Sequence, residues 1–211
     1  MARKDGRATP AGIPPHEHLD ADGFHALVRY SHIFSSAVRE ILEIKLLHEI
    51  GGNDLSLPQF HLLKLISLNG KHQIGQIADF LGVSPPAATK NIDKLERLGL
   101  LMRTPCEEDR RAILIASSQK GRQLVDRYEL LKKRRLEAVF DTFGADELEQ
   151  LIFLLERFSL ALIAAEGDCE GLCLRCSAYF DESCPIQHLH KGCPYRKAVD
   201  AKRGRSMEGE A

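Results

Sequence analysis

The first regular feature of the chain is a long amphipathic pattern near its N-terminal end. Over residues 20–50, apolar residues recur at the three- and four-residue spacing of a helix. Gly51-Gly52 is expected to stop this helix, because glycine is common just beyond helix C-termini. Ser56, as N-cap, and Pro58, in the first turn, then predict a second helix that runs to the break at Asn69-Gly70.

Two short helices and a hairpin are predicted next. The periodicity indicates a helix over residues 73–81, ended by Gly82, and another over residues 84–98. Alternating apolar residues indicate strands over 100–104 and 111–116, joined by a polar turn. Two short helices followed by a hairpin with a charged tip are typical of a winged helix-turn-helix.

Two further helices complete the periodic part of the chain. Ser118 is expected to cap a helix that runs to about Phe140, and a last helix follows Gly144 over residues 146–165. The fold is therefore expected to be mainly α with a small β-hairpin wing. The predicted division of the chain is a flexible arm at residues 1–19, the winged helix-turn-helix domain at 20–165, a cysteine-rich tail at 166–196 and a disordered end at 197–211.

Charge and hydropathy narrow the class of protein. The 211 residues carry a formal net charge of −1, so nucleic-acid binding would depend on local patches and not on a global basic field. The longest nearly uncharged apolar stretch, residues 158–165, is far shorter than the roughly 20 residues that span a bilayer. The N-terminal residues lack the apolar core of a secretion signal. We therefore predict a cytoplasmic protein with no membrane contact.

The predicted helix at residues 84–98 has the pattern of a DNA-recognition helix. Ser84 can cap its first N–H groups, and the following prolines lack N–H groups that would be orphaned there. The apolar residues at 88, 92 and 95 should pack inward. The residues expected to face DNA, by capping or by their outward position, are Ser84, Pro86, Ala87, Thr89, Lys90 and Lys94. The alternative is an ordinary helical hairpin with solvated lysines.

Residues 20–162 resemble the MarR family of bacterial transcription regulators. The resemblance is carried by the runs LSLPQFHLL (55–63), IGQIADFLGVS (74–84), TKNIDKLERLGLLMR (89–103) and DRRAILIASSQKG (109–121). It implies a homodimer, intertwined through its first and last two helices, on a pseudo-palindromic double-stranded DNA operator. It also implies that Arg111, with Arg110 adjacent, reaches the minor groove and that Asp109 helps to hold the wing arginine. Asn91 departs from the pattern, since an apolar residue is usual at its position.

The cysteines are concentrated in the tail. Five of the six lie after residue 168, with spacing C-x3-C-x2-C-x7-C-x8-C. Such a cluster in a cytosolic protein favours a metal site over disulfides. Irregular spacing, with proline after two of the cysteines, favours an iron–sulfur cluster, [4Fe-4S], and zinc is the alternative. The predicted ligands are Cys173, Cys176, Cys184 and Cys193, with Cys169 as a possible alternative ligand. The sixth, Cys106, is interpreted as an exposed bystander at the wing.

These patterns favour a DNA-binding transcription regulator, a repressor, whose DNA affinity is tuned by the metal centre. One alternative is a MarR-type regulator that senses a small molecule and holds only structural zinc. A second is an iron–sulfur electron-transfer component. The chain shows no nucleotide-binding glycine loop and no nucleophile–base pair, so we predict that it is not an enzyme and has no catalytic residues.

Overall fold

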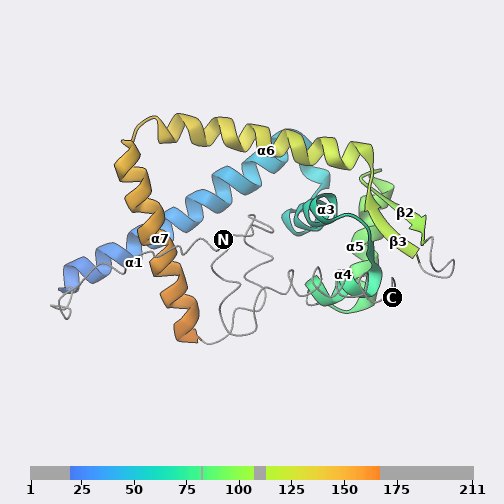
Figure 1. The fold of residues 1–211 in the computed structure, drawn as a ribbon, viewed down its shortest axis with the longest axis horizontal. Coiled ribbons are helices and arrows are strands. Elements are labelled where there is room, and N and C mark those ends of the chain that lie inside the picture. Colours follow the sequence, from blue (N-terminus) through green and yellow to red (C-terminus); the bar gives the residue numbers. More distant parts are fainter. Residues whose placement is uncertain (1–19, 82, 107–112, 167–211) are drawn as a thin grey trace, which may run out of the picture. The chain divides into compact units, whose positions relative to one another are not determined.

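A computed structural model describes residues 20–81, 83–106 and 113–166. Helices dominate, and three short strands form one sheet (Figure 1). In chain order the elements are α1 (Ala21–Ala37), η1 (a π-helical segment, Val38–Lys45), α2 (Leu46–Gly51), η2 (a 3-10 turn, Gly52–Asp54), α3 (Leu57–Asn69), β1 (His72–Gln73), α4 (Ile74–Leu81), α5 (Pro85–Arg97), β2 (Leu101–Pro105), β3 (Ile113–Ser117), α6 (Gln119–Phe140) and α7 (Ala145–Glu166).

The helix starts follow from local capping. The side chain of Asp20 accepts a hydrogen bond from the Gly23 N–H at 2.8 Å, so α1 begins where the pattern predicts. Ser118 Oγ likewise accepts from the Gly121 N–H at 2.9 Å at the start of α6. The predicted stop at Gly52 is confirmed, since its φ of 65° is a conformation that favours glycine.

The sheet differs from the predicted hairpin in one respect. Its strand order is β1-β3-β2, with both pairs antiparallel, and Arg103 of β2 lies opposite Ile115 of β3. The two-residue strand β1 was missed, whereas the helix predicted from about residue 73 to Leu81 is confirmed as α4, which begins at Ile74. Two residues carry no periodicity of their own, so only pairing with β3 defines β1.

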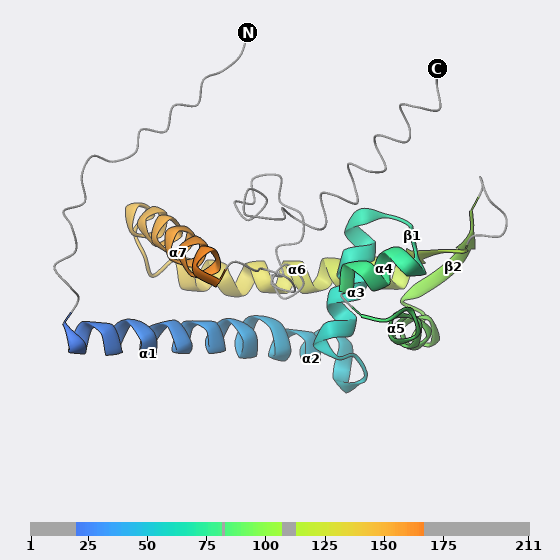
Figure 2. The ribbon, with the colours of Figure 1, turned by 90° about the horizontal axis from the view of Figure 1, so that it is seen from below.

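The core lies where α3, α5, α6 and β3 meet. Phe60 of α3 packs on Tyr128 of α6 with ring centroids 4.5 Å apart, and both side chains are buried. Leu95 and Ile115 are fully buried beside them, from α5 and β3. Figures 1 and 2 show the short helices and the strands gathered beside the N-terminal half of α6. The core therefore holds the predicted DNA-binding elements against one long helix.

A buried lysine also joins α3 to α6. Lys64 on α3 is only 6% exposed, and its Nζ lies 2.6 Å from Oε1 of Glu129 on α6. Lys132, one turn further along α6, lies 2.7 Å from the other carboxylate oxygen. Burial alone would raise the pKa of Glu129, but the hydrogen bonds from Lys132 and Lys64 outweigh it and lower the pKa below its ordinary value. Glu129 is therefore held as a carboxylate between two cations.

Candidate nucleic-acid interface

Helices α4 and α5 form a helix-turn-helix. Ile77 and Ala78 on α4 are buried, as are Ala88 and Ile92 on α5, and the two helices pack against each other. The Val83 N–H donates to the Ala78 carbonyl at 3.1 Å and closes the end of α4. The predicted inward face of the second helix is thus confirmed. The turn residue Gly82 lies outside the described residues.

The first turn of α5 lacks the predicted side-chain cap. Ser84 has the extended conformation of an N-cap, but its side chain makes no capping hydrogen bond. Pro85 and Pro86 have no N–H to offer it, and the Ala88 N–H is bound at 3.0 Å by the Ser84 backbone carbonyl. Ser84 therefore starts the helix through its backbone, and the prediction of a side-chain cap was wrong.

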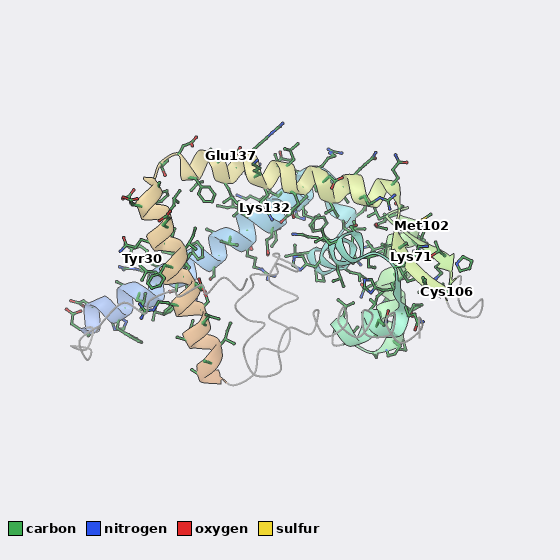
Figure 3. The ribbon with its side chains drawn as sticks, viewed as in Figure 1. Tyr30, Lys71, Met102, Cys106, Lys132 and Glu137 are labelled. Carbon is green, nitrogen blue, oxygen red and sulfur yellow. The ribbon has the colours of Figure 1, made fainter. Side chains whose placement is uncertain are left out.

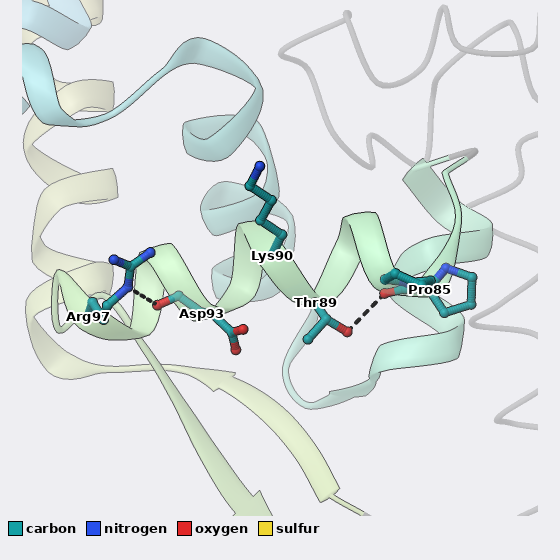
Figure 4. Close-up of a pocket in the computed structure, with 6 residues that line it drawn as sticks. Pro85, Thr89, Lys90, Asp93 and Arg97 are labelled. Carbon is teal, nitrogen blue, oxygen red and sulfur yellow. Dashed lines mark hydrogen bonds between the residues drawn. The ribbon is translucent and has the colours of Figure 1, made fainter.

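The outer face of α5 carries a shallow open depression (Figure 4). It is lined by Pro85, Pro86, Thr89, Lys90, Asp93 and Arg97. Lys90 extends away from the helix, whereas the Thr89 hydroxyl donates to the Pro85 carbonyl at 2.9 Å. Arg97 was missed by the sequence analysis, although it continues the four-residue spacing that begins at Pro85. Its Nε donates to the Asp93 carbonyl at 3.3 Å, and the residue is exposed.

The other residues predicted to face DNA differ in exposure. Ala87 and Lys94 are half-buried, while Ser84 and Pro86 are exposed. The Ala87 carbonyl accepts from Nδ2 of Asn91 at 3.2 Å, and Oδ1 of Asn91 accepts from Gln59 on α3 at 3.4 Å. Asn91, the departure from the family pattern, therefore links α3 to α5 and has a polar partner on each side.

An ion-pair cluster connects the wing strand β2 to α5. Nη2 of Arg103 lies 2.6 Å from Oδ1 of Asp93, and Nη1 lies 2.7 Å from Oε2 of Glu96. The hydrogen bond that Arg103 donates to Asp93 raises the pKa of Arg103; burial opposes this shift, and the negative charge of Glu96 adds to it. This cluster was not predicted, because nothing in the local pattern shows which strand residue faces the acidic side of α5.

The end of α5 is tied to the beginning of α6. Nζ of Lys120 donates to the Leu98 carbonyl at 2.8 Å, and Oγ of Ser118 donates to the Gly99 carbonyl at 2.6 Å. Gly99, with φ of 71°, makes the turn between them. The two carbonyls that follow α5 are therefore bound by side chains at the start of α6.

The wing itself is described only along its strands. Met102 lies on β2, and Cys106 follows that strand directly (Figure 3). The predicted bystander Cys106 is half-buried and carries no disulfide. The predicted minor-groove residues Arg110 and Arg111, and the predicted supporting acid Asp109, lie outside the described residues.

Two helices have large apolar side chains at their surface. No residue of α1 is buried, and Phe24, Tyr30 and Ile33 are all more than half exposed. On α7, Ile152 is 64% exposed, and Phe153 and Leu162 also face solvent. Scattered exposed apolar residues are ordinary, but sets this dense on one helix are typical of surfaces that a partner covers.

Neither the metal prediction nor a membrane role gains support from the described part of the chain. Within residues 20–81, 83–106 and 113–166, no group of three or more His, Cys, Asp or Glu side chains could hold a metal ion. The predicted ligands Cys169, Cys173, Cys176, Cys184 and Cys193 lie outside these residues. Among the described helices, none is both long enough and apolar enough to cross a bilayer.

Comparison with known proteins identifies the fold. Residues 55–113 match the model of the MarR family. The RV1404 protein of Mycobacterium tuberculosis is similar, with a TM-score of 0.60 and 22% identity over 70% of this chain and 98% of that one. FabT of Streptococcus pneumoniae, solved in complex with DNA, has a TM-score of 0.57 and 22% identity over 67% of this chain and 99% of its own. YusO of Bacillus subtilis has a TM-score of 0.56 and 20% identity over 67% of this chain and 98% of its own. The fold is thus the winged-helix fold of MarR proteins.

Proposed function

We propose that this chain is a transcription regulator of the MarR type that binds a pseudo-palindromic DNA operator as a homodimer and represses transcription. The observation that carries the proposal is the exposed outer face of α5, with Lys90 and Arg97 available and the apolar face locked into the core. The match of residues 55–113 to the family model, and the DNA complex of the similar FabT protein, support it.

The two kinds of side chain on α5 suit two kinds of contact. Lys90 and Arg97 are exposed cations that can reach phosphates or the acceptor edge of guanine in the major groove. Lys94 is half-buried, which suits a phosphate beside the helix more than a base edge. Arg110 and Arg111 at the wing remain predictions from the family resemblance, and would add minor-groove contacts.

The exposed apolar residues of α1 and α7 support the dimer. We expect a second copy of the chain to cover them, because removing apolar surface from water stabilises a complex by roughly 25 cal/mol for each Å² buried. A two-fold dimer would present two α5 helices to successive major grooves, about one helical turn apart. The operator is therefore expected to be a near-palindrome.

A charge reversal on α5 tests the proposed interface. Lys90→Glu places a negative charge where a phosphate or base edge is expected, so DNA affinity should fall by about 100-fold at moderate salt. The matched control is Lys133→Glu on α6, where the side chain is 73% exposed and its nearest carboxylate, Glu137, lies 3.7 Å away. Titration of both variants against the same duplex by fluorescence anisotropy measures the difference. Equal losses for the two variants would contradict an interface on α5.

The tail adds a second part to this proposal. We infer from the cysteine spacing alone that residues 169–193 bind a metal centre, a [4Fe-4S] cluster or zinc, that modulates DNA affinity. The tail contains few large apolar residues, so metal ligation would have to offset the cost of ordering it. A site directly after α7 could change the dimer, and through it the spacing of the two α5 helices.

Replacing two cysteines tests this metal proposal. Cys173→Ser combined with Cys176→Ser should abolish most of the bound metal after anaerobic purification, because serine is a far poorer ligand than thiolate. Iron, zinc and acid-labile sulfide analysis measure the loss, and operator affinity is compared with that of the wild type. Cys106→Ser is the matched control and should retain the metal. Full metal content in the double variant would contradict the ligand assignment.

A further inference from the structure

The cluster around Arg103 joins the two elements that would read DNA. Arg103 lies in the middle of β2, opposite Ile115 of β3, and so belongs to the hairpin that forms the wing. Asp93 and Glu96 lie three residues apart on α5, which puts both carboxylates on one side of the helix. The guanidinium contacts one carboxylate with each terminal nitrogen, at 2.6 and 2.7 Å.

We propose that Arg103 is a positioning residue that fixes the wing at a set distance from the recognition helix and thereby sets the spacing between major-groove and flanking minor-groove contacts on the operator. This inference rests on the proposed function, since it assigns a role within the same DNA-binding surface.

The hairpin is held at its base by the core and further out by Arg103. Its base is anchored in the core, because Leu101 of β2 and Ile115 of β3 are buried. Further along β2, the Thr104 hydroxyl bonds only within the sheet, to the Leu114 carbonyl. In the described part of the hairpin, Arg103 therefore supplies every polar bond from β2 to α5. Without it, no polar bond among the described residues would hold this part of the hairpin to α5.

The shape of the arginine side chain suits a positioning role. A guanidinium is planar and rigid, so binding two carboxylates at once fixes the direction of the arginine as well as its distance. A lysine ammonium is a point charge that can approach either carboxylate but does not impose that direction. Because the three side chains are one-third to one-half exposed, the cluster adds little to stability. Its orienting role is therefore separable from folding.

Arg103 also changes the charge that the cluster presents to DNA. Asp93 lines the same outer face of α5 as Lys90 and Arg97, where DNA phosphates would approach. Asp93 at that face, together with Glu96 beside it on Arg103, repels DNA unless a cation compensates the two carboxylates. Arg103 reduces the local charge of the cluster from −2 to −1. A variant that removes only the arginine would therefore weaken binding by repulsion as well as by loss of position, and the two effects must be separated.

Three variants separate them. Arg103→Gln breaks the connection and leaves both carboxylates uncompensated. The triple variant Arg103→Gln, Asp93→Asn and Glu96→Gln also breaks the connection, but its cluster is neutral and repels DNA less than the wild type does. Arg103→Lys keeps the positive charge but loses the planar guanidinium that binds both carboxylates at once. Urea unfolding of each variant checks that the fold is retained.

The test measures the affinity of each protein for an operator selected with the wild type and for random duplex, together with hydroxyl-radical footprints. We expect the triple variant to bind random duplex at least as tightly as the wild type, yet to bind the operator about tenfold more weakly or worse. Its footprint should lose the flanking minor-groove protection and keep the central protection. Arg103→Lys should fall between the wild type and Arg103→Gln in operator affinity.

The triple variant decides between position and charge. Operator affinity and flanking protection equal to the wild type in that variant would overturn the proposal and leave Arg103 as a neutralising charge. Unchanged operator affinity in Arg103→Gln would overturn it as well. A wild-type protein that prefers no duplex would instead contradict the proposed function, so the two failures are distinguishable.

Discussion

Gly121→Ala is expected to destabilise the protein by about 3 kcal/mol, because the added methyl group has no room. A Cβ at residue 121 would lie 2.2 Å from the Leu100 carbonyl oxygen and 3.0 Å from a Leu63 methyl group. The first of these atoms is backbone, and it also accepts a hydrogen bond from the Ser118 N–H at 3.0 Å. Relief therefore requires α6 to move away from the turn that follows α5.

The measurement is urea unfolding of the wild type and two glycine variants. Gly75→Ala is the matched control, because nothing lies within 4 Å of a Cβ built at that helical position. It should be neutral or stabilise the protein by up to about 1 kcal/mol, through the higher helix propensity of alanine. A Gly121→Ala variant that unfolds at the same urea concentration as the wild type would show that the close approach of α6 to Leu100 is not required.

Glu129→Leu is expected to cost about 2–3 kcal/mol, because it removes a close counter-charge of a buried lysine. Lys64 is 6% exposed and lies 2.6 Å from Glu129. Lys64→Met should cost less, about 1 kcal/mol, since Glu129 keeps Lys132 and partial access to water. The double variant replaces the pair by apolar groups and should recover most of the loss.

The same pair predicts a pH dependence. The pKa of Glu129 is lowered in the folded protein, so its contribution is present above the ordinary glutamate pKa and is lost as the pH falls through the folded value. The stability difference between the wild type and Glu129→Leu should therefore shrink as the pH is lowered below about 4.5. Urea unfolding of both proteins at a series of pH values measures this difference.

The double variant tests whether Lys64 and Glu129 interact directly. Losses of the two single variants that simply add, with no recovery of stability in the double variant, would contradict a direct interaction.

Sequence periodicity located the elements of this fold because caps and glycines mark their ends locally. Asp20 and Ser118 cap α1 and α6 through their own side chains, and Gly52 and Gly99 adopt positive φ just after α2 and α5. The buried face of α5 was equally predictable, since every inward position follows the helical repeat.

What sequence reasoning missed depends on tertiary contact. The strand β1 exists only because it pairs with β3, and Arg103 finds its two carboxylates only once β2 is folded onto α5. Lys64 shows the same limit, since a lysine is seldom buried without a partner and one such partner, Glu129, is 65 positions away on α6. The wing arginines and the tail cysteines stay predictions, because they lie outside the described residues.

Selection of duplexes from a random-sequence pool tests the central claim of a dimeric, sequence-specific regulator most directly. The full chain, purified anaerobically, is allowed to bind the pool at moderate salt. The bound duplexes are sequenced, and the mass of the protein–DNA complex is measured to count the chains on each duplex. We expect enrichment of a near-palindrome with half-sites about 10 base pairs apart, two chains per duplex, and an affinity about 10³-fold or more above that for random duplex. A pool from which no sequence outcompetes random duplex, or a single chain on each duplex, would contradict the account.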